Sequence, residues 1–286
     1  MNYISNGYCY KIDKRKKGGV SGEVVFFKYV GDLTGKERIL SAPINLVKKK
    51  VLAGIYALNT NDVNDLIKNV DMEVQLFNKA YSHFGAPFFS LGQACRVRTK
   101  TELSVIMPMI TGISLEEFMN GKAFGEIEPN SYCDNEVSIF ESVFHKLRDL
   151  FNINISHGDL NIGNIMIINS FFEIFFIDFV EAITWTDEEM ENSIKKNIIF
   201  DIISNSIMSD IVRVIYGIFV CRYLYESKID KRYNYQTNTV TKIIDRYYLE
   251  DLFKDYRIDL KSVYKKIKFY WSYSGSKLGV SKPQWS

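Results

Sequence analysis

The eight residues HGDLNIGN at positions 157–164 place a His, an Asp and an Asn on one short polar stretch between apolar segments. Ahead of it, residues 135–151 carry apolar side chains at spacings of three and four, which predicts a long amphipathic helix. After it, the apolar runs NIMII and FFEIFFIDF are joined by Asn and Ser, which predicts a tight β-hairpin. A helix, a polar loop and a hairpin in this order would return Asp178, near the end of the second strand, to the loop.

Three oxygen-bearing side chains converge in this arrangement: Asp159 and Asn164 on the loop, and Asp178 beyond the hairpin. Amide and carboxylate oxygens are hard ligands that suit Mg²⁺, so Asn164 and Asp178 are candidate metal ligands. Asp159 is then left to accept a proton from an incoming hydroxyl, as a general base does. The alternative interpretation is a capped turn in a protein core that happens to hold two acids.

The stretch resembles the catalytic loop of the protein-kinase-like superfamily, H-R-D-L-x-x-x-N, and residues 178–180, DFV, stand where that family has D-F-G. The variant H-G-D followed by GNIM is more similar to the aminoglycoside, choline and lipopolysaccharide-core kinases than to typical Ser/Thr protein kinases. The resemblance implies an α+β fold of two lobes, with a small β-rich N-lobe that has one main helix and a larger helical C-lobe. It also implies an enzyme that binds ATP and Mg²⁺.

The chain changes character near residues 108–113. Before this point the patterns predict three strands, a helix over 61–84 and two further strands, whereas beyond it most predicted elements are helices. We therefore expect an N-lobe over 1–110, a C-lobe over 111–275 and a flexible tail over 276–286.

In the N-lobe the resemblance implies a glycine-rich hairpin over the ATP phosphates, because backbone N–H groups must approach them closely. The stretch KKGGVSGEVVFF offers Gly19, Gly22 and Val24 in the order G-x-x-G-x-V. Lys17 stands where the first Gly would be, and Gly18 would supply the missing flexibility.

The family also has a phosphate-binding Lys after an apolar strand, and INLVKKKVL offers Lys48 directly after Val47. Strand alternation would direct Lys49 to the opposite face, and Lys50 is the alternative on the same face as Lys48. The competing interpretation of this stretch is a solvated basic edge.

The partner of the Lys should be a Glu on the next helix, and Glu73 lies there on the apolar stripe with Val70 and Phe77. A carboxylate on a buried stripe is unfavourable unless it is paired. We therefore expect a Lys48–Glu73 ion pair that directs the Lys towards the α and β phosphates. Otherwise Glu73 is a surface residue at the edge of the stripe.

The stretch SVIMPMITGISLEEF resembles the strand and hinge beside the adenine of ATP, with Met107 at the gatekeeper position. Adenine would be bound by the backbone carbonyl of Pro108 and the backbone N–H of Ile110. Pro108 has no N–H of its own, and in this arrangement none is needed.

The chain departs from the protein kinases in ways that bear on its substrate. Gly158 stands where many protein kinases have the Arg that awaits an activating phosphate, Asn161 replaces a Lys, and no A-P-E follows Asp178. Regulation by phosphorylation of an activation loop is therefore not expected, and the short segment after Asp178 favours an acceptor that is not a protein.

Two further positions have expected structural roles. Either Asp201 or Asp210 would anchor the catalytic loop from a C-lobe helix, and SDIVRVIY favours Asp210. In the family that the loop resembles, His157 packs beneath the loop, so we do not assign it as a base.

Composition narrows the remaining classes. The net charge of +2 lacks the basic excess typical of nucleic-acid binding, and none of the four cysteines forms a CxxC pair that would indicate a zinc or redox site. Dispersed cysteines and an N-terminus without a continuous apolar run favour a cytoplasmic location.

Two stretches of the second half could be taken for membrane segments. The apolar stretch 211–225 is interrupted by two arginines and is interpreted as a core helix. The basic, aromatic stretch 261–271 could contact an anionic membrane surface but is more typical of a solvated helix face.

The expected reaction is transfer of the γ-phosphoryl group of ATP to a hydroxyl of a sugar or other small molecule, such as a lipopolysaccharide-core sugar. The first alternative is a protein Ser/Thr kinase, for example a trimmed effector that bacteria secrete into a host cell. The second alternative is a pseudokinase that serves as a binding scaffold. The presence of a Lys, two Asp and an Asn at the positions that the family uses argues against this alternative.

Overall fold

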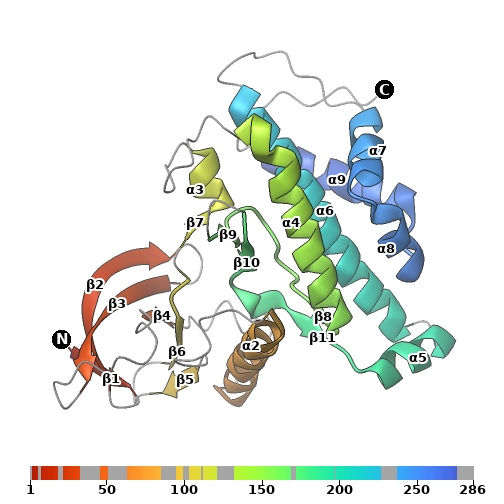
Figure 1. Cartoon of the computed structure of the whole chain (residues 1–286). Coiled ribbons are helices and arrows are strands. Elements are labelled where there is room, and N and C mark those ends of the chain that lie inside the picture. The colour runs from red at the N-terminus through yellow and green to blue at the C-terminus, as the bar shows by residue number, and fades with distance from the viewer. Residues whose placement is uncertain are drawn as a thin grey trace. The chain divides into compact units, whose positions relative to one another are not determined.

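The structure is a computed structural model that describes residues 2–5, 8–18, 22–32, 46–50, 63–84, 95–98, 103–110, 112–120, 132–168, 172–196, 198–226 and 237–275. The chain divides into two compact units, Met1–Ile110 and Thr111–Ser286. It is a mixed α+β protein, because the first unit is built mainly from a sheet and the second mainly from helices (Figure 1). The predicted tail over 276–286 lies outside the described residues.

The first unit contains a six-stranded sheet, whose strands are β1 (Asn2–Ser5), β2 (Tyr8–Gly18), β3 (Gly22–Asp32), β4 (Leu46–Lys50), β5 (Cys95–Arg98) and β6 (Leu103–Pro108). Their order across the sheet is β1-β2-β3-β4-β6-β5, and each neighbouring pair is antiparallel. Strand β6 is paired on both sides and buries Val105 and Ile106. The strands that the sequence predicts over 23–30, 93–99 and 103–110 are confirmed as β3, β5 and β6.

One long helix of this unit, α2 (Val63–Phe84), packs against β5. Its buried face includes Val70, Phe77 and Tyr81, at the predicted spacings of helix periodicity. The rings of Phe77 and Tyr81 stack with centroids 4.1 Å apart. The apolar stripe thus attaches the helix to the sheet, and Glu73 lies within it.

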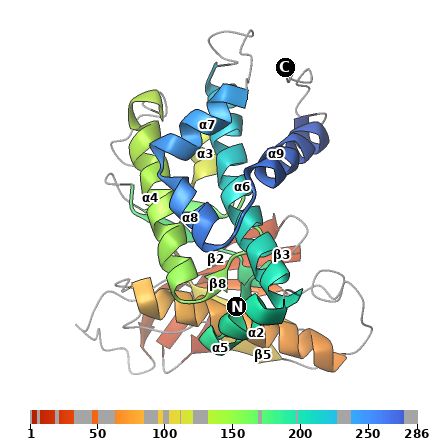
Figure 2. The same cartoon turned by 90° about the vertical axis from the view of Figure 1, so that its right-hand side faces the viewer.

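The described helices of the second unit are α3 (Leu115–Met119), α4 (Tyr132–Asn152), α5 (Asp187–Lys196), α6 (Ile198–Glu226), α7 (Thr237–Arg246), α8 (Leu249–Asp255) and α9 (Leu260–Gly275). Helix α6 packs against α3, α4, α5 and α9 and is the centre of the unit (Figure 2). The predicted stripe of α4 is largely buried, since Phe140, Phe144, Leu147 and Phe151 are covered.

Helix α6 is long and apolar enough over Asp201–Cys221 to cross a membrane by length and composition, with a mean hydropathy of 1.4. A core helix meets the same criterion, and 61% of this stretch is buried inside the structure. Two polar residues in its middle, Asp210 and Arg213, contact other side chains of the unit. These contacts fit the predicted core helix.

Short strands hold the polar loop of the second unit. Strands β7 (Ile113–Ser114), β9 (Ile165–Ile167) and β10 (Ile174–Phe176) form one small sheet in the order β10-β9-β7. Strands β8 (Ile155–Ser156) and β11 (Ile183–Thr184) form a second. Because residues 157–164 run from β8 to β9, both ends of the loop are fixed in hydrogen-bonded strands.

Candidate active site

The loop at 157–164 and the segment after β10 meet through the backbone. The N–H of Ile177 donates to the carbonyl of Asn164 at 3.0 Å, and Asp178 is the next residue. Antiparallel pairing of β9 with β10 brings the two segments together, as the hairpin pattern predicts. The three predicted residues Asp159, Asn164 and Asp178 thus belong to two directly bonded segments.

Asp210 on α6 anchors the start of this loop. Its Oδ2 accepts hydrogen bonds from the hydroxyl of Ser156 at 2.6 Å and the backbone N–H of His157 at 2.7 Å, and its Oδ1 accepts from the N–H of Gly158 at 2.9 Å. Asp210 is fully buried, whereas Asp201 is exposed. The preference for Asp210 as the anchor is therefore confirmed.

The buried carboxyl of Asp210 should make stability depend on pH. Burial raises its pKa to about 7, although the hydrogen bonds from Ser156, His157 and Gly158 and the charge of Lys266 oppose the rise. A folded-state pKa above the unfolded value near 3.9 stabilises the fold below about pH 4, and this stabilisation is lost as the pH rises through 7.

We expect the unfolding free energy of the wild type, relative to that of Asp210→Asn, to fall by roughly 4 kcal/mol between pH 4 and pH 8. Urea unfolding of both proteins across this range would measure the difference, since the amide of the variant does not titrate. A difference that is constant with pH would contradict this assignment.

Gly158 is required by the shape of the loop. Its φ is +79°, and a Cβ built on it would lie 2.1 Å from the carbonyl oxygen of Glu181. Gly is the residue that adopts this left-handed conformation without strain. The shape of the loop therefore explains why position 158 is occupied by Gly.

Gly158→Ala is expected to lower the unfolding free energy by about 2 kcal/mol, from the left-handed conformation alone, and to displace residue 181. Gly163→Ala is the matched control, because its Cβ would meet the flexible ends of Glu116 and Asn161 at 3.0 and 3.1 Å instead of backbone. Thermal unfolding of the two variants would test this expectation, and an equal loss of stability in both would contradict it.

His157 is a structural residue, as predicted. It is fully buried, its Nε2 lies 3.0 Å from the carbonyl oxygen of Ile177, and its ring centroid is 4.8 Å from that of Phe179. The imidazole thus joins the loop to the segment that carries Asp178.

Asp159 presents a half-buried carboxylate. Its Oδ2 accepts hydrogen bonds from the amides of Asn161 at 3.3 Å and Asn164 at 3.4 Å, and its Oδ1 forms an ion pair with Arg213 on α6. The amide of Asn164 also donates to the backbone carbonyl of Asp159 at 2.8 Å. Because the nitrogen of Asn164 faces Asp159, the amide is oriented with its oxygen on the other side.

Arg213 and Glu181 were not predicted as site residues. The second guanidinium nitrogen of Arg213 lies 3.9 Å from a carboxylate oxygen of Glu181. Burial raises the pKa of Glu181, and the negative charge of Asp178 raises it further. Glu181 and Asp178 therefore place two like charges close together, which an added cation would stabilise.

The fit to Mg²⁺ rests on the chemistry of the donor set. Asp178 has a left-handed backbone, with φ 70° and ψ 67°, which is rare for a residue other than Gly and is common at functional sites. Among the described residues, no group of three or more His, Cys, Asp and Glu side chains forms a metal cluster. Mg²⁺ in phosphoryl-transfer sites is held by one or two carboxylates with water and phosphate oxygens, so Asp178 and Asn164 suit it.

In the first unit the structure corrects the predicted ion pair. Glu73 is paired with Lys49, not with Lys48, at 3.3 Å from Nζ to Oε1, and the side chains are 8% and 2% exposed. Lys49 stands between Val24 and Val105 in the sheet, and adjacent residues of a strand point to opposite faces. The predicted strand phase was thus wrong by one residue, which exchanges the two faces.

Lys49→Met is expected to lower the unfolding free energy by about 1–3 kcal/mol, because it leaves the buried Glu73 without this partner. Lys48→Met is the matched control on the next residue, which is half-buried on the opposite face. Chemical denaturation would compare the two variants. A larger loss of unfolding free energy in Lys48→Met would favour the predicted Lys48–Glu73 ion pair.

Three other predicted nucleotide-binding residues, Gly18, Gly22 and Pro108, lie on the same sheet. Gly18 ends β2 and Gly22 begins β3, and the two are register partners. Gly19 lies outside the described residues. Pro108 ends β6 opposite Leu46, and Ile110 follows as a half-buried residue outside the strands.

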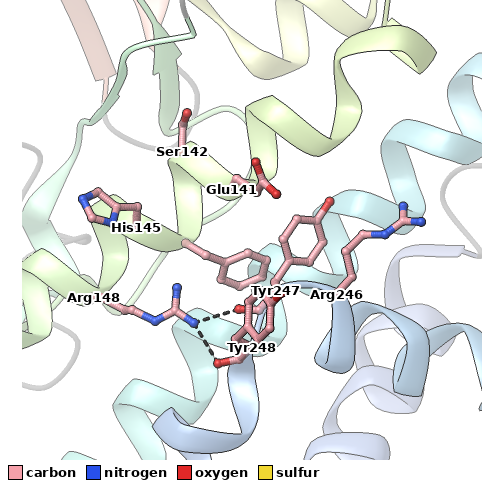
Figure 3. A pocket seen from close by; sticks show the side chains of 8 residues that line it. Glu141, Ser142, His145, Arg148, Arg246, Tyr247 and Tyr248 are labelled. Atoms are coloured by element: carbon pink, nitrogen blue, oxygen red, sulfur yellow. Dashed lines mark hydrogen bonds between the residues drawn. The ribbon is translucent and has the colours of Figure 1, made fainter.

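A separate cavity of about 410 Å³ opens on the second unit beside α4 and the end of α7 (Figure 3). A guanidinium nitrogen of Arg148 donates to the carbonyls of Tyr247 at 2.7 Å and Tyr248 at 2.8 Å, just after α7. The predicted site residues are not among those that line it, which are Glu141, Ser142, Phe144, His145, Arg148, Arg246, Tyr247 and Tyr248.

A scan against protein-family models finds no match to this chain, and a search of curated proteins finds none either.

Proposed function

We propose that this protein is an ATP-dependent kinase with the two-lobed fold of the protein-kinase-like superfamily. The observation that carries the proposal is the anchored loop: Asp210 accepts hydrogen bonds from the amides of His157 and Gly158, and the next residue, Asp159, presents a half-buried carboxylate. A merely structural turn could be capped by the buried Asp210 alone, and it would not require the second carboxylate, Asp159, beside it. Protein-kinase-like enzymes use this arrangement of residues to receive a hydroxyl proton.

In the proposed reaction the acceptor oxygen forms a bond to the γ-phosphorus of ATP, and the bond from that phosphorus to the β–γ bridging oxygen breaks. ADP leaves with the bridging oxygen, and the hydroxyl proton passes to Asp159 and then to solvent. Asp159 is therefore the residue that orients the acceptor and receives its proton. Most of the rate enhancement would come from positioning and from neutralising charge.

The two units would contribute different groups. Lys49, oriented by Glu73, would bind phosphate oxygens, and Gly18 and Gly22 would let backbone N–H groups approach them. Asn164 and Asp178 would hold Mg²⁺, which when bound neutralises charge on the phosphates. Adenine would bind the carbonyl of Pro108 and the N–H of Ile110.

We propose a sugar or another small molecule as the acceptor, such as a lipopolysaccharide-core sugar. Peptide substrates of kinases lie on a long activation segment, and here α5 begins at Asp187, only a short way beyond Asp178. The intervening residues are a 3₁₀ turn, Phe179–Glu181, and the short strand β11. This segment supports a small acceptor over a protein.

The test combines binding and transfer. Mg·ATP at one hundred times its Kd should raise the unfolding free energy of the wild type by about 2.7 kcal/mol. Asp178→Asn should lose most of this gain, whereas Asp201→Asn, an exposed carboxylate on α6, should keep it. Radiolabelled ATP offered with sugars, small alcohols and proteins would then identify the acceptor.

Each outcome has a distinct meaning. Label on sugars or small alcohols supports the proposal, and label on proteins alone replaces the acceptor class with a protein. Binding of Mg·ATP without any turnover would leave a binding scaffold, and no binding in the wild type would overturn the kinase proposal.

A further inference from the structure

Two residues one helical turn apart on α6 contact the same catalytic loop. Asp210 binds its backbone, and Arg213 forms an ion pair with the carboxylate of Asp159. Residues three apart on a helix lie on the same face, so both side chains extend from one face of α6 towards the loop. Since α6 is the central helix of the second unit, this face is a rigid support.

Arg213 is itself held by the C-terminal helix. Its Nε donates to the hydroxyl of Tyr270 on α9 at 3.2 Å, and its guanidinium carbon lies 5.5 Å from the centroid of that ring. The same hydroxyl lies 3.3 Å from the hydroxyl of Ser209. A hydrogen bond and a cation–π contact from one residue limit the orientations that the guanidinium can adopt.

Together these contacts fix both oxygens of the Asp159 carboxylate. Oδ1 is held by Arg213, and Oδ2 is held by the amides of Asn161 and Asn164. A carboxylate has about four lone-pair positions, and these three contacts use three of them, so Oδ1 keeps one for the proton of an acceptor. The contacts therefore orient the carboxylate without consuming its capacity to accept.

We propose that Arg213 is a positioning residue that acts on catalysis through Asp159, and that Tyr270 extends this support to α9. The inference rests on the proposed kinase function and assigns to the basic C-terminal helix a part in the active site. A misplacement of about 1 Å in a catalytic group can lower a rate a hundredfold, so loss of this support should reduce turnover.

The readout is release of phosphate from Mg·ATP with water as the acceptor, because this needs no knowledge of the natural acceptor. Arg213→Gln should lower kcat about ten- to one-hundredfold with the KM for ATP unchanged. Arg213→Lys should recover part of the loss, since it keeps the charge. Tyr270→Phe keeps the ring but removes the hydroxyl, and it should lower kcat about two- to fivefold.

Matched controls separate this role from general stability. Tyr264→Phe removes another hydroxyl of α9, one that lies 2.8 Å from the hydroxyl of Thr241 and does not contact Arg213. Arg148→Gln removes another partly buried guanidinium that binds backbone carbonyls. Both should keep the wild-type kcat, and thermal unfolding of each variant would show whether it is folded.

The decisive measurement is a double-mutant cycle with Asp159→Asn. If Arg213 acts through Asp159, then Arg213→Gln should have no further effect once Asp159 is replaced. Independent, additive losses would overturn the inference. If the double variant is too slow to measure or Arg213→Gln fails to fold, Arg213→Lys and Tyr270→Phe decide, and wild-type rates in both would overturn it.

Failure of the inference and failure of the proposed function look different. A wild type that turns over ATP while Arg213→Gln stays within about twofold of it contradicts only the positioning role. A wild type that neither hydrolyses ATP nor transfers phosphate removes the proposed function, and the positioning role falls with it.

Discussion

Asp210→Ala is expected to lower the unfolding free energy of the second unit by about 3–5 kcal/mol at pH 6. The reason is that one fully buried carboxyl accepts hydrogen bonds from Ser156, His157 and Gly158, and alanine removes this acceptor from two buried donors and from the half-buried N–H of Gly158. Removal of one partner leaves a buried donor unsatisfied at a cost of about 1–3 kcal/mol, whereas replacement of both partners by apolar groups can be nearly neutral. The start of the loop should therefore lose its defined shape.

Urea unfolding would measure this loss, with Asp201→Ala as the control, because Asp201 lies on the same helix but is exposed. Ser156→Ala removes only one of the three donors and should have an effect of about 1 kcal/mol. Amide hydrogen exchange should show faster exchange at residues 157–159 in Asp210→Ala. If Asp210→Ala is no less stable than the control, the anchoring role assigned to this residue is wrong.

Periodicity predicted the elements that surround the loop, because it is a local signal. Phe140, Phe144 and Phe151 recur at helical spacing and are buried on α4, and the apolar runs on either side of residues 169–171 form β9 and β10. The short strands β7, β8 and β11 have two residues each, which is too few for any alternation to be read. Their pairing depends on contacts from distant parts of the chain.

The lysines of β4 illustrate a limit of predictions from local sequence patterns. Three lysines in a row place a Lys on both faces of the strand, so alternation alone leaves the register open. In the structure it is fixed by pairing with β3 on one side and β6 on the other. Only then does Lys49, not Lys48, meet Glu73.

Arg213 could not be found from the loop itself, because it lies 54 positions beyond Asp159 in the chain and only the packing of α6 brings the two together. One signal was present: Arg213 follows Asp210 by three residues, on the same helix face as the predicted anchor. Glu181 similarly follows Asp178 by three residues, in a segment that periodicity does not describe. In both cases a charged residue follows a residue predicted from the sequence by three positions.

In the proposed function, Asp159 orients and deprotonates an acceptor hydroxyl during phosphoryl transfer. Asp159→Asn keeps the size of the side chain and removes its ability to accept that proton. We expect transfer of the γ-phosphoryl group to fall by about 10²- to 10⁴-fold, the usual range for a general base. Binding of Mg·ATP should change little, because Asp159 is not a proposed ligand of the metal or the nucleotide.

The most direct measurement is total transfer of label from γ-labelled ATP, to water and to a panel of alcohols and sugars, in three proteins. Wild type and Asp149→Asn, a half-buried carboxylate of α4 outside the proposed site, should transfer phosphate at equal rates, while Asp159→Asn should be slower by at least about a hundredfold. Equal rates in wild type and Asp159→Asn, or no transfer by a folded wild type, would contradict the assignment of the loop as a catalytic centre.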